Sequence, residues 1–198
     1  MRTLLLTSVL LLFCAPTRAD TPAGKVLSET RNHLAFPAPD QLVVGDYRFS
    51  MGALSLWGAT SSLIGMSLMI RSRPTSVQNW SSPQTKSMFF GGLQHLSWGA
   101  IDLGLGIGAL AVSYSMLGRL RPPTNTQVAR IFWINAGLDL LYLSFAAVAM
   151  GLSTRATQDR DFWRGTGESV AIQAGFLMVY DVANAIRFMT HARRAKKK

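Results

Sequence analysis

Three carboxylates lie inside stretches of this sequence that are otherwise apolar, and they are the side chains best suited to chemistry. They are Asp102, Asp139 and Asp181, and each is surrounded by residues such as Leu, Ala and Val. A carboxylate at the centre of a membrane-spanning helix costs about 2.5–3.5 kcal/mol on insertion scales, so such residues are usually paired or functional. We therefore expect these carboxyl groups to be satisfied against one another, against a cation or against water.

Other polar residues share these apolar stretches with the carboxylates. On a helix, His95 and Asp102 lie on one face because they are seven residues apart, and Asn135 and Asp139 lie on one face because they are four apart. Gln173 is close in angle to Asp181 on the last helix. The sequence thus predicts a polar cluster inside the membrane with the following members: His95, Asp102, Asn135, Asp139, Gln173 and Asp181.

Depth in the membrane links two of these carboxylates. Asp139 lies about eight residues from the start of a predicted helix at 131–152, and Asp181 about eight from the end of another at 168–189. If these helices are antiparallel, both side chains lie roughly 12 Å below the same membrane face, at about 1.5 Å per residue. We expect the two carboxyl groups within about 10 Å of each other, with like-charge repulsion and desolvation keeping one protonated. Gly137 and Gly175 are predicted to let the two backbones approach.

Two interpretations of the polar cluster follow. In the first, the polar groups hold the helices together, at about 0.6 kcal/mol for each interhelical contact. In the alternative, they form a proton or cation relay, since chains of intramembrane Asp and His mark such pathways. A metal site has less support, because His95 has no second ligand at HxxxH or CxxC spacing.

No catalytic motif accompanies the cluster. The sequence contains no HExxH pattern and no evident Ser–His–Asp arrangement. Gly104-Leu-Gly-Ile-Gly108 is no phosphate-binding loop, because it lies within an apolar helix and follows no strand. We therefore expect a protein that is not an enzyme and has no cofactor.

Four apolar blocks must position these residues, and they predict an all-α integral membrane bundle of four transmembrane helices. The predicted helices span 49–70, 87–117, 131–152 and 168–189, and each reaches the roughly 20 residues that a bilayer requires. Arg, Lys and Pro lie between the blocks, as is usual for the ends of membrane spans. Small residues let helices approach closely, and the pairs Gly58–Ser62 and Gly104–Gly108 fit the small-xxx-small pattern.

The N-terminal residues have the three parts of a secretory signal peptide. Arg2 is followed by an apolar run and then by Thr17-Arg18-Ala19, which resembles a cleavage site. An uncleaved anchor is the alternative. The predicted organisation is a signal peptide at 1–19, a polar extracytoplasmic segment at 20–48, a four-helix transmembrane domain at 49–190 and a basic, frayed tail at 191–198.

The charge of the chain points to lipid rather than nucleic acid. The formal net charge is +10, but the basic residues lie mainly at the ends of apolar blocks, where lipid headgroups are found. No basic face with interleaved aromatic residues is present, which argues against nucleic acid. We expect a multi-pass protein of the bacterial plasma (inner) membrane. Its basic tail is expected to contact anionic lipid headgroups. The sequence leaves open whether the chain binds another membrane protein or forms a homo-oligomer. It also leaves open the side of the membrane on which the C-terminus lies, because the signal peptide favours the outer side and the basic tail favours the cytoplasm.

Four pieces of the chain together resemble a known family. They are Gln94-His95 with Trp98 and Asp102, Asn135–Asp139 with Tyr142, Gly165-Thr-Gly167, and Gln173–Leu177 with Asp181. Across about 51–187 the chain is similar to an uncharacterised family of bacterial membrane proteins, a domain of unknown function with a signal sequence and four helices. The resemblance implies the fold and no activity.

Overall fold

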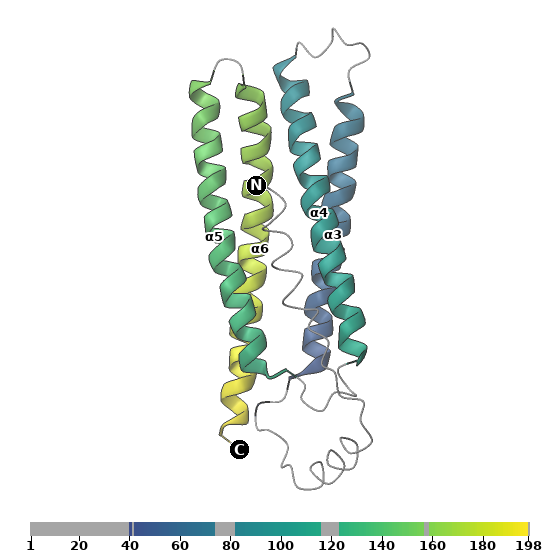
Figure 1. Cartoon of the computed structure of the whole chain (residues 1–198), viewed down its shortest axis with the longest axis vertical. Helices are drawn as coiled ribbons and strands as arrows, with labels where there is room; N and C mark the ends of the chain where they lie inside the picture. Colours follow the sequence, from purple (N-terminus) through teal and green to yellow (C-terminus); the bar gives the residue numbers. More distant parts are fainter. Residues whose placement is uncertain (1–39, 41, 74–81, 116–122, 157–158, 198) are drawn as a thin grey trace, which may run out of the picture. The chain divides into compact units, whose positions relative to one another are not determined.

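The computed structural model describes residue 40 and residues 42–73, 82–115, 123–156 and 159–197. In these residues the chain forms four helices, α3 (Val44–Arg71), α4 (Pro83–Ser115), α5 (Asn125–Arg155) and α6 (Arg160–Ala195), and no strand. Figure 1 shows that they lie side by side as two hairpins, α3 with α4 and α5 with α6. The predicted all-α fold with four helices is confirmed, whereas the predicted signal peptide at 1–19 lies outside the described residues.

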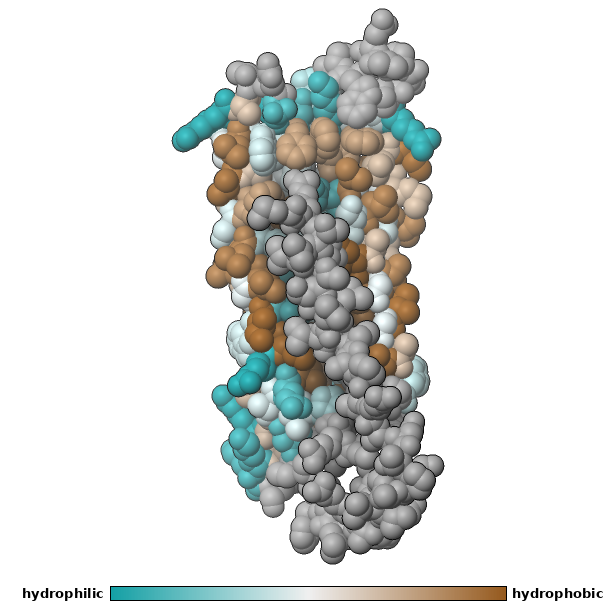
Figure 2. Space-filling model, viewed as in Figure 1, coloured by the Kyte–Doolittle hydropathy of each residue, from teal (hydrophilic) through white to brown (hydrophobic). Residues whose placement is uncertain are grey.

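All four helices are long enough and apolar enough to cross a membrane. The shortest has 28 residues and the longest 36, and the hydrocarbon core requires about 20. Large apolar side chains such as Leu56 and Val179, both 71% exposed, point away from the bundle. Figure 2 shows hydrophobic residues over the middle of the visible face and hydrophilic residues toward its two ends, which is the distribution that a bilayer favours.

The helices extend beyond the apolar blocks from which they were predicted. Helix α5 begins at Asn125, six residues before the predicted start, because Thr124 and Gln127 form a capping box with bonds of 3.2 and 2.9 Å. Helix α6 continues to Ala195, so the prediction of a frayed tail from His191 is wrong for these residues. At about 54 Å, α6 is longer than the hydrocarbon core is thick, and hydropathy marks only the part inside that core.

Glycines seven residues apart join α3 to α4. Gly58 and Gly65 of α3 face Gly99 and Gly92 of α4, and Gly106 of α4 faces Ser55 of α3. A Cβ at Gly99 would lie 2.6 Å from the carbonyl oxygen of Gly58, and a Cβ at Gly92 would lie 2.8 Å from that of Gly65. Only glycine permits this approach, and a repeat of seven residues keeps the same face of each helix against its partner along the hairpin. We call this line of glycines between α3 and α4 the glycine seam.

Two predicted close-packing pairs are not at any interface. A Cβ at Gly104, Gly108, Gly137 or Gly175 would meet no heavy atom within 4 Å, so the predictions for these glycines are wrong. The α5–α6 hairpin instead packs through Gly167, whose Cβ would lie 3.2 Å from the carbonyl oxygen of Ala146. Spacing alone does not say which face of a helix meets its neighbour, because lipid-facing and buried small residues follow the same period.

The two hairpins meet mainly along α4 and α6. Near one end, a Cβ at Gly165 would lie 3.0 Å from the backbone nitrogen of Gly91, and Phe90 packs edge-on against Phe162. Between α3 and α6 the contact is made by side chains, with the ring of Trp57 stacked 3.8 Å from that of Phe176. The interior between the hairpins is therefore filled by side chains, and many of them are polar.

Candidate functional site

The three intramembrane carboxyl groups come together from three helices. Asp102 of α4, Asp139 of α5 and Asp181 of α6 are each 5% exposed or less. The carboxyl groups of Asp139 and Asp181 are hydrogen-bond partners, and Asp102 lies close enough to interact electrostatically with both. We call these three residues the carboxyl cluster. It contains one side chain of the α3–α4 hairpin and two of the α5–α6 hairpin.

Two oxygens of the carboxyl cluster have no partner. Oδ2 of Asp102 and Oδ2 of Asp139 are fully buried, and neither is within hydrogen-bonding distance of a donor among the described residues. The ion pairs of the described residues join Asp46 to Arg187 and His191 and Arg164 to Glu168, so none includes a cluster carboxylate. A buried carboxylate without donor or counter-ion is costly, so the cluster requires protons, water or a cation to be stable.

A second group of polar side chains lies about two helical turns from the carboxyl cluster along α4 and α6 and is connected by hydrogen bonds. The indole Nε1 of Trp57 donates to Oε1 of Gln173 at 2.8 Å. The amide nitrogen of Gln173 donates to Oγ of Ser61 and to Nδ1 of His95, the latter at 3.1 Å. Ser61 in turn donates to the backbone oxygen of His95 at 3.1 Å. We call these four residues, which join α3, α4 and α6, the Gln173 network.

The Gln173 network determines which atoms carry protons. An indole nitrogen can only donate, so the side chain of Gln173 must turn its oxygen toward Trp57 and its NH₂ group toward His95. His95 Nδ1 must then accept, which leaves the imidazole proton on Nε2. His95 thus acts here as a neutral hydrogen-bonding residue, buried to 6% exposure.

Polar contacts continue from the carboxyl cluster to the end of the bundle at which α3 begins. The hydroxyl of Tyr180 donates to the backbone oxygen of Ser50 at 2.8 Å, and Ser50 donates to Oδ1 of Asn184 at 2.5 Å. One helical turn further out, Asp46 accepts from Arg187, and Nε2 of His191 lies 2.6 Å from Asp46 Oδ2. Side chains of α3 and α6 therefore remain in polar contact from the cluster to this end.

One carboxylate at the same end lies outside the helices. Oδ2 of Asp40 accepts from the backbone nitrogen of Thr126 at 3.1 Å and from its hydroxyl at 2.5 Å, at the start of α5. Partial burial alone would raise the pKa of Asp40, but hydrogen bonds from Thr126, Asn125 and Thr124 outweigh it and hold the pKa below its usual value. A negative charge at a helix N-terminus is also favourable.

Of the six residues predicted for the site, Asn135 belongs neither to the carboxyl cluster nor to the Gln173 network. It is only half-buried, and no hydrogen bond among the described residues joins it to the carboxyl cluster. His95 and Gln173 lie together in the Gln173 network. The prediction did not include Trp57, Ser61, Ser50 or Tyr180. The available signal was spacing, since Ser50, Trp57 and Ser61 follow a seven- and four-residue pattern on one face of α3.

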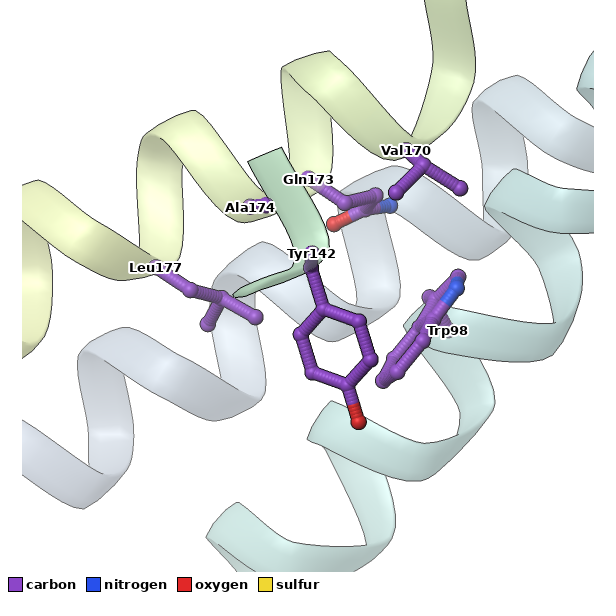
Figure 3. A pocket seen from close by; sticks show the side chains of 6 residues that line it. All are labelled: Trp98, Tyr142, Val170, Gln173, Ala174 and Leu177. Atoms are coloured by element: carbon purple, nitrogen blue, oxygen red, sulfur yellow. The ribbon is translucent and has the colours of Figure 1, made fainter. Parts of the chain in front are cut away.

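A shallow hollow opens beside the Gln173 network. Its cavity volume is about 10 Å³, and Figure 3 shows Trp98 and Tyr142 at one side with Gln173 behind them. The two aromatic rings meet edge-on at 5.0 Å. Pockets for drug-sized ligands usually hold about 300–1,000 Å³, so this hollow is too small for such a ligand. Among the described residues, no three His, Cys, Asp or Glu side chains are placed to hold a metal ion.

Comparison with known proteins gives one match. Residues 53–182 match a family of unknown function, DUF6992, which covers more than half of the chain. The chain belongs to the DUF6992 family. The resemblance to an uncharacterised family is therefore confirmed. No curated protein and no solved structure matches the chain.

The DUF6992 region contains only part of the polar interior. The carboxyl cluster and the Gln173 network lie entirely within residues 53–182. Ser50, Asn184 and the ion pair of Asp46 with Arg187 lie outside it. The centre of the polar interior thus coincides with the DUF6992 match, and its outer end does not.

Proposed function

We propose that this DUF6992 protein is a non-enzymatic multi-pass protein of the bacterial plasma membrane, an accessory or structural component. In this proposal the polar interior joins two helical hairpins into one bundle. Four helices long and apolar enough to span a membrane support the location. The family has no assigned function.

The Gln173 network is the observation that carries this proposal. Gln173 of α6 is 2% exposed and uses its oxygen and its NH₂ group on partners from both helices of the other hairpin. A side chain whose donors and acceptor are all paired has no group left for a substrate. Satisfied polar networks give a core a unique geometry, as a structural role requires.

A flux measurement tests the structural role. Purified full-length protein is reconstituted into liposomes that contain a pH-sensitive dye, and a proton, Na⁺ or K⁺ gradient is applied. We expect the same leak as from liposomes without protein, while the protein remains helical and inserted. A gradient-driven flux that depends on the protein would contradict the proposal.

One observation favours a second candidate, a small proton- or cation-coupled transporter or channel component. The unpartnered oxygens of Asp102 and Asp139 are groups that an ion could occupy. If a flux is found, Asp139→Asn and Asp181→Asn discriminate the two functions, because an amide keeps the size of the side chain and removes its charge. Loss of flux in folded variants would establish transport through the carboxyl cluster.

The proposed partners are anionic lipids at the end of α6. Arg193, Arg194, Lys196 and Lys197 are exposed and follow the apolar part of this helix. Each basic residue near an anionic surface contributes about 1 kcal/mol, within a Debye length. A protein partner or a second copy of the chain is a further proposal for which the described residues carry no specific contact.

A further inference from the structure

We propose that Asp102, Asp139 and Asp181 form one proton-binding site inside the membrane, and that protons reach it from the end of the bundle at which α3 begins and α6 ends. The inference rests on the proposal that the bundle spans a membrane. It goes further by naming the ligand and its route, and it holds whether or not the protein transports anything.

An unpartnered oxygen of Asp102 indicates a ligand. Asp139 and Asp181 lie within interaction range of each other across the α5–α6 interface, and two carboxyl groups can bond to each other only through a shared proton. Asp102 comes from the other hairpin, is 4% exposed, has one buried oxygen without a donor among the described residues, and interacts electrostatically with Asp139. Three buried carboxylates cannot all be ionised in a low-dielectric interior without a counter-charge.

The groups that face the cluster supply no counter-charge. Helix α4 contributes Asp102, α5 contributes Asp139, and α6 contributes Tyr180 and Asp181; Tyr47 of α3 lies beside Tyr180. These are acids, and no Lys or Arg of the described residues pairs with them. A proton is the ligand that three such acids take without a cavity, whereas the described residues offer no arrangement of ligands for a metal ion.

Polar side chains of α3 and α6 lie between the carboxyl cluster and one end of the bundle. Tyr180 lies beside Asp181 and donates to the backbone of Ser50, and Ser50 donates to Asn184. The next polar groups outward are Asp46 and His191, whose side chains are 22% and 27% exposed and so reach water. The binding step balances without an oxidant, because a hydronium ion at this end gives its proton to a carboxylate oxygen and becomes water, and the polar groups between them favour the passage of the charge.

Between the Gln173 network and the opposite end of the bundle, the described polar groups of α6 do not form a chain. The hydroxyls of Thr166 and Ser169 are buried and have no partner among the described residues. Beyond them, Gly165 packs against the backbones of Ser87 and Gly91, with Phe90 against Phe162. Beyond the Gln173 network, close backbone packing and aromatic contacts leave no polar step among the described residues on this side, so we infer that access to the cluster is one-ended.

Infrared spectroscopy of the full chain in liposomes tests the binding site, because a protonated carboxyl has its own C=O band that shifts in D₂O. We expect this band to persist at pH 7, where exposed carboxyls with values near 4 are ionised. Asp139→Asn and Asp181→Asn should lower its amplitude, whereas Glu168→Gln, which removes an exposed carboxyl of the same helix, should leave it unchanged. The absence of the band from the parent protein above about pH 6 would overturn the site, and this result requires no variant to fold.

The rate of band formation after a drop in pH tests the route. Tyr180→Phe removes one hydroxyl on the proposed path and should slow proton uptake at least roughly tenfold, since a positioned proton-transfer group contributes about 10²-fold or more. Thr166→Val is the matched control, because it removes one hydroxyl at the opposite end and should leave the rate unchanged. The reverse result would overturn one-ended access. Neither readout depends on flux, so a failure here is separate from a failure of the structural role.

Discussion

The indole nitrogen of Trp57 donates a hydrogen bond of 2.8 Å to the side-chain oxygen of Gln173, which belongs to the other hairpin. This contact orients the amide, and the amide then reaches Ser61 and His95. In a bilayer the lipid tails are as apolar as the helix surfaces, so helix association depends on such bonds and on close packing. The α3–α4 hairpin depends mainly on close packing, whereas the contact between the hairpins combines close packing at Gly165 with hydrogen bonds from Gln173.

Replacing Gln173 tests this contact. Gln173→Leu keeps the volume of the side chain but leaves Trp57, Ser61 and His95 without their partner, so we expect a loss of about 1–2 kcal/mol in the free energy of unfolding. Gln94→Leu is the control, because Gln94 is partly buried on α4 and belongs to no described network. The measurement is unfolding in mixed detergent followed by Trp fluorescence. Equal stability of the two variants would show that the network contributes nothing.

The glycine seam predicts opposite effects of one substitution at two sites. Gly99→Ala places a Cβ 2.6 Å from the carbonyl oxygen of Gly58 and should cost about 1–3 kcal/mol by overpacking. Gly104→Ala meets no atom within 4 Å and should be neutral or stabilise by about 0.5–1 kcal/mol, because alanine favours the helix. Thermal unfolding in detergent measures both. A destabilised Gly104→Ala with an unaffected Gly99→Ala would mean that the seam is misplaced.

The number of helices and the burial of the carboxylates were predictable from the sequence, because both depend on local composition. A long apolar block predicts a span, and Asp139 or Asp181 inside such a block must turn away from lipid. Which small residues face a neighbour was not predictable in the same way. Gly104 and Gly108 satisfy a four-residue rule, but the seam follows Gly92, Gly99 and Gly106.

The hydrogen-bond partners of the buried polar groups were not predictable either, because the partners lie far apart in the sequence. Trp57 and Gln173 are 116 residues apart, and nothing local indicates that an aromatic residue will donate to an amide on the last helix. Asn135 shows the opposite error, since it shares a stripe with Asp139 yet is only half-buried. A side chain four residues away can lie at the edge of a buried face.

The basic end of α6 predicts salt-sensitive binding to anionic lipids. Replacing Arg193, Arg194, Lys196 and Lys197 by Gln should leave insertion intact but weaken contact with vesicles containing phosphatidylglycerol by about 1 kcal/mol for each charge at low salt. Raising the salt concentration should reduce the difference between parent and variant, because the Debye length falls to about 3 Å at 1 M. Fluorescence quenching by labelled lipids measures this contact. Unchanged quenching at low salt would contradict the prediction.

The contact of Asp40 with the start of α5 predicts a dependence on acid pH. Since hydrogen bonds from Thr126 hold the pKa of Asp40 below its usual value, the ionised form is the one that stabilises the fold. That contribution is complete above the unfolded value near 3.9 and is lost as the pH falls through the lower folded value. Asp40→Ala should therefore be less stable than the parent at pH 7 and equally stable at about pH 2. A difference that grows on acidification would have the wrong sign.

The same substitution, Asp to Asn, should have different effects at the two ends of the polar interior. Asp46→Asn leaves Arg187 and His191 without their carboxylate, and the loss of this partly exposed ion pair should cost about 1 kcal/mol. Asp139→Asn and Asp181→Asn remove a charge that faces another acid, so neither substitution leaves a positively charged residue without its partner. An amide resembles a protonated carboxyl in size and hydrogen bonding, so each of these variants should be as stable as the parent at pH 7 or more stable. Unfolding in detergent compares the three. If Asp139→Asn and Asp181→Asn both lose more stability than Asp46→Asn, the carboxyl cluster is ionised and paired with a cation, and like-charge repulsion does not govern the centre of the bundle.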